Sequence, residues 1–98
     1  MSQPIYVSFK MKAKEPWYQL SEDEKNAMMA KMNASMEAVG AESIVMCDCS
    51  WSSEPWQYLG VVKFPSLEAL QKHRQDANGF DWPRYVDGHS IVGTEWQP

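Results

Sequence analysis

The segment ESIVMCDCSWSSEPWQYLGVVKF (residues 42–64) decides the fold that we predict for this chain. Its first part, residues 42–51, is apolar on both alternating faces, which is typical of a strand that is buried on both sides. Residues 52–55 have turn chemistry, and residues 57–64 form a second apolar run that ends before Pro65. The simplest interpretation is a β-hairpin made of these two strands.

A helix is predicted on each side of this hairpin. Before the hairpin, Ser21 and Glu24 have the spacing of a capping box, and Gly40 can take the left-handed conformation that ends a helix. The residues at helical spacing between these ends are Met28, Met29, Met32, Met36 and Val39. After the hairpin, Ser66 caps a second helix that closes at residues 78–79. Its apolar stripe contains Leu70, His73, Ala77 and Phe80.

Two more strands are predicted outside the helices. Apolar and polar residues alternate from Ile5 to Lys12 and again from His89 to Trp96, where we expect a bulge at Gly93. The order β-α-β-β-α-β over residues 1–98 predicts a single α+β domain of the ferredoxin-like type. In that fold a four-stranded antiparallel sheet carries two helices on one face.

One face of such a sheet stays uncovered by helices. The hairpin strand at 42–51 is apolar on both sides, and Tyr6 lies on the face opposite Ile5 and Val7. A second copy of the chain, packed sheet against sheet about a two-fold axis, is the simplest cover for this apolar surface. We therefore expect a homodimer that encloses a barrel-like interior.

Composition and charge exclude several classes of function. The formal charge of −4 argues against binding to nucleic acids or anionic membranes, which relies on clustered lysine and arginine. The sequence has no apolar run long enough to span a bilayer and no visible secretory signal, so we expect a cytoplasmic protein. Cys47 and Cys49 are too close in sequence for a loop-closing disulfide, which also favours a reducing compartment.

Three segments carry a resemblance to a known superfamily: residues 16–25, 62–68 and 79–85. With them the chain resembles the dimeric α/β-barrel superfamily, and within it the small bacterial proteins of unknown function typified by darcynin. The resemblance implies a pocket between sheet and helices for small, largely apolar molecules. It further implies one of the activities found in the superfamily: cofactor-free monooxygenases, lactone isomerases, cyclases, dehydrochlorinases and haem-binding enzymes. Fold likeness alone does not choose among these activities.

The two histidines are the candidate proton carriers at neutral pH. His73 lies on the apolar stripe of the second helix, so it is either a pocket base or a core histidine with one satisfying hydrogen bond. His89 follows Asp87 by two residues, and residues i and i+2 share a strand face, so the carboxylate could orient the ring as an acid/base dyad. The alternative is that Asp87 and Gly88 form an ordinary turn.

Asp48 is the third candidate acid/base group. If its strand face points into the barrel, burial would raise the pKa of its carboxyl; the alternative is that it reaches solvent or pairs with Lys63 or Arg84. The two thiols at 47 and 49 lack the paired C-x-x-C spacing of structural zinc sites, so no metal is expected. Haem remains an option because either histidine could be an axial ligand.

Aromatic side chains with polar tips suit a pocket for flat apolar molecules with one or two oxygens, although core or interface packing is the alternative. The candidates are Tyr6, Trp17, Tyr58, Trp82 and Tyr85. We therefore expect a homodimer that binds an apolar or aromatic small molecule and performs cofactor-independent acid/base chemistry on it. The alternatives are a non-catalytic ligand-binding or accessory protein and a haem-binding enzyme.

Overall fold

The computed structural model describes residues 3–97, and its four strands form one antiparallel sheet in the order β2-β3-β1-β4. The strands are β1 (Ile5–Ala13), β2 (Glu42–Asp48), β3 (Tyr58–Phe64) and β4 (Val86–Gly93). The helices are α1 (Glu15–Tyr18), α2 (Glu22–Ala38), α3 (Leu67–Gly79) and α4 (Trp82–Tyr85). This order confirms the predicted ferredoxin-like α+β fold.

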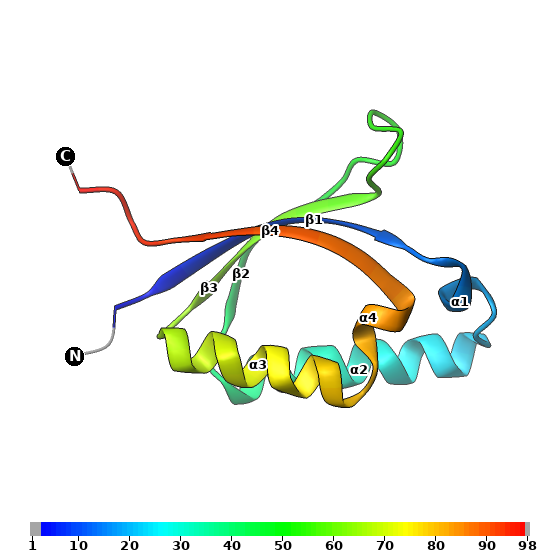
Figure 1. Cartoon of the computed structure of the whole chain (residues 1–98), viewed down its shortest axis with the longest axis horizontal. Helices are drawn as coiled ribbons and strands as arrows, with labels where there is room; N and C mark the ends of the chain where they lie inside the picture. Colours follow the sequence, from blue (N-terminus) through cyan, green and yellow to red (C-terminus); the bar gives the residue numbers. More distant parts are fainter. Residues whose placement is uncertain (1–2, 98) are drawn as a thin grey trace.

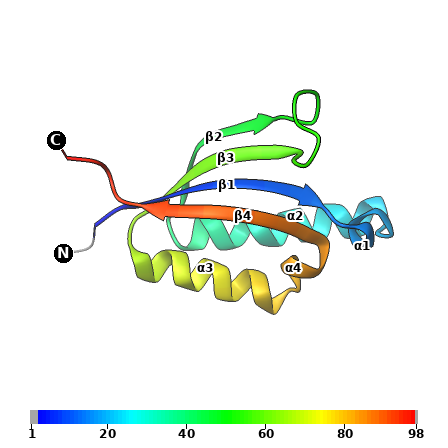
Figure 2. The same cartoon turned by 45° about the horizontal axis from the view of Figure 1, so that its top comes forward.

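The two long helices lie on one face of the sheet, as Figures 1 and 2 show from two directions. The strand register explains why. Val7 of β1 pairs with Val62 of β3 and with Val92 of β4, so the apolar members of the alternation share the helix side of the central strands. Val7 and Val62 pack there with Phe64 and Leu70 to form the buried core.

Local sequence signals set the ends of the long helices. The Ser21 hydroxyl accepts from the Glu24 amide at 3.1 Å while the Glu24 carboxylate accepts from the Ser21 amide at 3.0 Å, which confirms the capping box. Gly40 has a φ of +77°, the left-handed conformation expected after a helix. The Ser66 hydroxyl accepts from the Ala69 amide at the start of α3. Within residues 3–97, no helix combines the length and apolarity needed to cross a bilayer.

The predicted burial of the strand at 42–51 on both sides is wrong for the chain by itself. β2 ends at Asp48 and is an edge strand, and Ile44, Val45 and Met46 are 51%, 44% and 52% exposed. An edge strand has no neighbour on its outer side, and a register shift between Ser43 and Val45 disrupts its pairing with β3. Apolar composition correctly indicated an apolar strand, but it did not indicate that the single chain leaves this strand exposed.

Smaller differences concern the connections. The loops expected at residues 14–20 and 80–85 each contain one helical turn, α1 and α4, with proline near the N-terminus where its missing amide costs nothing. β4 begins at Val86 and ends at Gly93, earlier than predicted, because its residues pair with β1 from Ala13 to Tyr6.

The face of the sheet turned away from the helices is called the open face below. Register pairs share a face, so this face is assigned from the partners of Ser8 and Lys10 on both neighbouring strands. Its members are Tyr6, Ser8, Lys10, Lys12, Val45, Cys47, Leu59, Val61, Lys63, Asp87, His89 and Ile91. Ile91 is 70% exposed, so the open face presents apolar side chains to solvent in the single chain.

Candidate functional site

A cavity of about 440 Å³ lies between the helix side of the sheet and helices α2 and α3. Phe9 and Met11 of β1 contribute apolar wall from the sheet, and Met29 and Met32 contribute it from α2. The polar and charged residues in the lining whose side chains are not on the open face are Asn33, His73, Arg74, Asn78 and Ser90. Lys10 also borders the cavity, but its register places its side chain on the open face. A largely apolar space with a few polar groups is typical of a small-molecule site.

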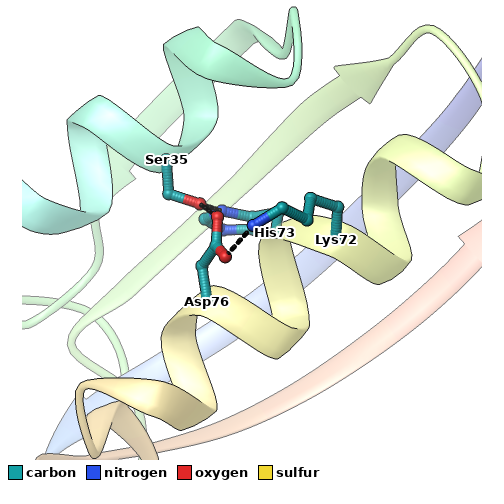
Figure 3. A network of polar contacts seen from close by, with 4 residues as sticks. All are labelled: Ser35, Lys72, His73 and Asp76. Atoms are coloured by element: carbon teal, nitrogen blue, oxygen red, sulfur yellow. Dashed lines mark hydrogen bonds and ion pairs between the residues drawn. The ribbon is translucent and has the colours of Figure 1, made fainter.

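His73 joins this cavity to a polar network between the two long helices, drawn in Figure 3. The residue is only 8% exposed, and its ring packs against Phe64 with centroids 5.6 Å apart. His73 Nδ1 lies 2.9 Å from the Ser35 hydroxyl oxygen of α2, and that oxygen lies 2.8 Å from Oδ2 of Asp76. The ring is therefore a core residue with one hydrogen-bonded nitrogen that also lines the cavity, and its role as a base stays a prediction.

The second ring nitrogen of His73 is the group left for chemistry. Within residues 3–97, Nε2 has no hydrogen-bond partner, and no fully buried side-chain nitrogen or oxygen lacks one. Nε2 is therefore not fully buried, and the ring that carries it lines the cavity. Burial lowers the pKa of His73, with the nearby Arg74 charge acting in the same direction and the Asp76 charge opposing it. A histidine with a lowered pKa is neutral at neutral pH and can accept a proton.

The other end of the network keeps a carboxylate ionised. Lys72 contacts Asp76 one helical turn away, and hydrogen bonds from Lys72 and Ser35 lower the pKa of Asp76. The carboxylate is thus an acceptor at neutral pH. The arrangement of Asp76, Ser35 and His73 resembles the support of a catalytic base by a hydrogen-bonded acid, with a serine hydroxyl placed between them.

The sequence of the chain matches one known protein family. The model of a family of unknown function, DUF6616, matches residues 5–98. The chain belongs to the DUF6616 family. No match was found among curated proteins.

The DUF6616 chain is also similar to solved structures. One is a putative chlorite dismutase, with a TM-score of 0.71 and 13% sequence identity. The match covers 96% of this chain but only 46% of that protein, so the DUF6616 chain spans about half of its length. At this identity the likeness shows the ferredoxin-like fold alone, and the resemblance to the dimeric α/β-barrel superfamily and to darcynin stays a prediction.

The predicted dyad of the DUF6616 chain lies on the other side of the sheet. Asp87 and His89 share a face of β4, as their spacing predicted, but their register partners are Lys12 and Lys10 on the open face. Both are exposed, and the cavity is lined from this strand by Val86, Gly88 and Ser90 instead. The structure therefore separates the two histidines.

Asp48 does not have the environment required for a raised pKa. Its carboxylate is exposed and accepts hydrogen bonds from the Ser50 amide at 2.9 Å and the Ser50 hydroxyl at 2.7 Å. These bonds lower the pKa of Asp48, so the expectation of a desolvated acid is wrong and the solvent alternative holds. Cys47 and Cys49 are free thiols, and within residues 3–97 no three His, Cys, Asp or Glu side chains gather as metal ligands do.

The five aromatic candidates of the DUF6616 chain occupy four different places. Trp82 lines the cavity and packs edge-on against Trp17, with ring centroids 6.3 Å apart. Tyr85 lines a separate cavity of about 330 Å³ beside α1. Tyr6 lies on the open face under Lys63, and Tyr58 is exposed at the start of β3. Of the nine residues predicted for the site, the cavity brings together His73 and Trp82.

Ser35 and Asp76 were not among the residues predicted for the site. Ser35 continues the helical spacing of Met28 and Met32, so a polar residue on the buried stripe of α2 was the available signal. Asp76 follows His73 by three residues on one face of α3. The hydrogen bond between Ser35 and Asp76 depends on how α2 packs against α3, and local sequence patterns do not predict this packing.

The DUF6616 site does not fit a haem group. A haem ligand borders a space as wide as the macrocycle, so without the group its ring is widely exposed; His73 is 8% exposed and packed against Phe64. His89 projects from the open face rather than into the cavity.

The lowered pKa of His73 predicts how stability depends on pH. An unfolded histidine titrates near pH 6.5, so below about that value the unfolded chain binds a proton that the folded chain resists. The free energy of unfolding should therefore fall as the pH drops from neutral to about 5, before Asp76 titrates. In the variant His73→Gln this part of the slope should vanish. Urea unfolding at fixed protein concentration measures it, and an equal slope in both proteins would contradict the prediction.

Proposed function

We propose that this protein is a homodimer that binds a small apolar or aromatic molecule in the cavity between the sheet and the α2–α3 layer. His73 acts there as the proton acceptor in cofactor-independent acid/base chemistry. The chemistry falls in the class of proton abstraction next to a carbonyl, which is shared by isomerases and cyclases and can begin an elimination or a cofactor-free oxygenation. The alternative is a protein that binds the same ligand without acting on it.

The observation that carries this proposal is the position of His73. Its Nδ1 is held by Ser35, while Nε2 is not fully buried and belongs to a ring that lines an apolar cavity. A general base needs a neutral ring, a fixed orientation and a free nitrogen at the substrate. Burial and the Ser35 contact provide the first two conditions, and Nε2 provides the third.

The open face supports the dimer. Val45, Leu59 and Ile91 are exposed there, whereas the long helices cover only the opposite face (Figure 2). The sheet of the solved relative belongs to a chain about twice as long, so oligomeric state is not carried over from it. The apolar surface itself is the argument, because a second sheet of the same kind would bury it.

Deuterium exchange into 2-tetralone, an aromatic ketone with acidic C–H bonds, tests the chemistry. The base removes a proton from the carbon next to the carbonyl, and the enolate then takes deuterium from solvent. His73→Gln keeps a group that can bond Ser35 but cannot act as the base, so exchange should fall about 100-fold. Proton NMR in deuterium oxide follows the signal, with the buffer-catalysed rate subtracted.

A substitution at the second histidine and a pair of matched phenylalanine variants test the identity of the base and the place of binding. The same substitution at His89 asks whether the other imidazole is the base; exchange lost there and retained in His73→Gln would overturn the assignment. Ser90→Phe places a ring in the cavity from an exposed strand position, and Gln71→Phe makes the same change on the exposed side of α3. Tetralone binding should be lost in Ser90→Phe alone. Binding without exchange in the wild-type protein would favour the non-catalytic alternative.

A further inference from the structure

The direction of the hydrogen bonds around His73 can be worked out by counting protons. The Ser35 hydroxyl has one proton and lies within hydrogen-bond distance of both Asp76 Oδ2 and His73 Nδ1. An ionised carboxylate can only accept, so the Ser35 proton goes to Asp76. The Ser35 oxygen must then accept from His73, which places the proton of the neutral ring on Nδ1.

Lys72 keeps Asp76 ionised and thereby fixes the direction in which Ser35 donates its proton. Its ammonium group can only donate, and it donates to the same carboxylate that receives the Ser35 proton. Asp76 therefore sits between two donors and stays ionised. The chain of bonds runs from Lys72 and from His73 through Ser35, both ending on Asp76, as Figure 3 shows.

We infer that Ser35 and Asp76 are positioning residues that hold His73 in the Nδ1–H tautomer, and that the cavity selects molecules with an apolar body and a hydrogen-bond-donating hydroxyl, as in phenols and enols. This inference rests on the proposed function for the cavity and adds the class of ligand. With its proton on Nδ1, the ring presents only a lone pair at Nε2. A ligand that places an ether, ketone or carboxylate oxygen against Nε2 leaves this nitrogen unpaired, so a ketone such as 2-tetralone should be held more tightly in its enol form.

The rest of the lining agrees with such a ligand. Met29, Met32 and Trp82 supply apolar contact for a flat body. Asn33, Asn78 and Ser90 can meet further oxygens of the ligand because their side chains both donate and accept. Of the nitrogen- and oxygen-bearing side chains in this part of the lining, His73 in this tautomer offers only an acceptor to the cavity, so it decides where the hydroxyl lies.

Nitrogen-15 NMR of the histidine rings tests the tautomer without any ligand. Long-range proton–nitrogen correlations at neutral pH distinguish a protonated Nδ1 from a protonated Nε2, and the exposed His89 provides a reference ring in the same spectrum. His73 should show the proton on Nδ1. Ser35→Ala and Asp76→Asn should each shift the His73 ring toward the Nε2–H tautomer. Ser35→Thr keeps the hydroxyl, so this variant should retain the Nδ1–H tautomer. An Nε2–H ring in the wild-type protein, or a tautomer unchanged in both variants, would overturn the inference.

A matched pair of ligands tests the chemical class. The wild-type protein should bind 2-naphthol about tenfold more tightly than 2-methoxynaphthalene, which has the same body without the donor. In Ser35→Ala this preference should approach equality, measured by calorimetry. Equal binding of both compounds by the wild-type protein would refute the ligand class while leaving the proposed function intact. Failure of both to bind would instead refute the cavity as a site for apolar aromatic molecules.

Discussion

Gly60→Ala is expected to destabilise the protein by about 3 kcal/mol, because the added methyl group has no room. A Cβ at this position would lie 2.8 Å from Cζ of Phe9, 2.9 Å from the backbone oxygen of Val45 and 3.2 Å from Sδ of Met46. The Phe9 ring could move, but the Val45 oxygen belongs to the neighbouring strand, so the β2–β3 pairing must shift. Replacing a strand glycine by alanine otherwise gains about 0.5–1 kcal/mol, and the clash outweighs that gain.

Gly93→Ala is the matched control for this prediction. Gly93 also lies in a strand, but a Cβ there would meet nothing within 4 Å, so the variant should be as stable as the wild type or slightly more stable. Urea unfolding followed by tryptophan fluorescence measures both variants at one protein concentration. In thermal unfolding of the same variants, we expect the Tm of Gly60→Ala to fall by roughly 15 °C. If the two glycine variants had equal stability, the close packing of β2, β3 and β1 would be refuted.

Val61→Glu is expected to convert the proposed homodimer into a monomer. Val61 lies on the open face in an inner strand, with Ser8 and Val45 as its register partners. In a two-fold sheet-to-sheet dimer, both copies would place a carboxylate in the interface, close to the two-fold partner's copy of the same charge. Burying such charges costs several kcal/mol, and a loss of about 4 kcal/mol weakens association roughly a thousandfold.

Light scattering after size exclusion measures this effect at micromolar protein. The wild type should have about twice the chain mass of 11.3 kDa, and Val61→Glu should have the single mass. Leu67→Glu is the control, because it makes the same kind of change at an exposed residue at the start of α3, where a carboxylate is favourable. It should remain a dimer. A wild-type monomer, or a dimer unaffected by Val61→Glu, would refute association through the open face.

Much of the fold could be predicted from short-range patterns. The alternation from Ile5 to Lys12, the capping box at Ser21 and the cap at Ser66 depend on residues within a few positions of one another. The strand and helix periods they produce are physical consequences of backbone geometry. The position of β2 at the edge could not be read in this way, because sheet order depends on which strands meet after the chain has crossed over twice.

The candidate site was predicted less completely for the same reason. The sequence alone determined that two imidazoles were available, that one lay on an apolar helical stripe and that the other shared a strand face with Asp87. It left open which ring faces a cavity. It also contained no sign that Ser35 would meet His73, which is 38 residues away in the sequence.

The amino-acid sequence by itself determined the four strands and the two long helices of this protein, their order and the apolar composition of the β2 segment, since each follows from local spacing and side-chain type. Only the tertiary structure decided that the helices cover the face with Phe9 and leave the face with His89 open. The packing of α2 against α3 then brought Ser35 between His73 and Asp76. Hydrogen-bond direction at that junction depends on contacts between separate helices, and for that reason the chemistry of Nε2 became apparent only in the folded chain.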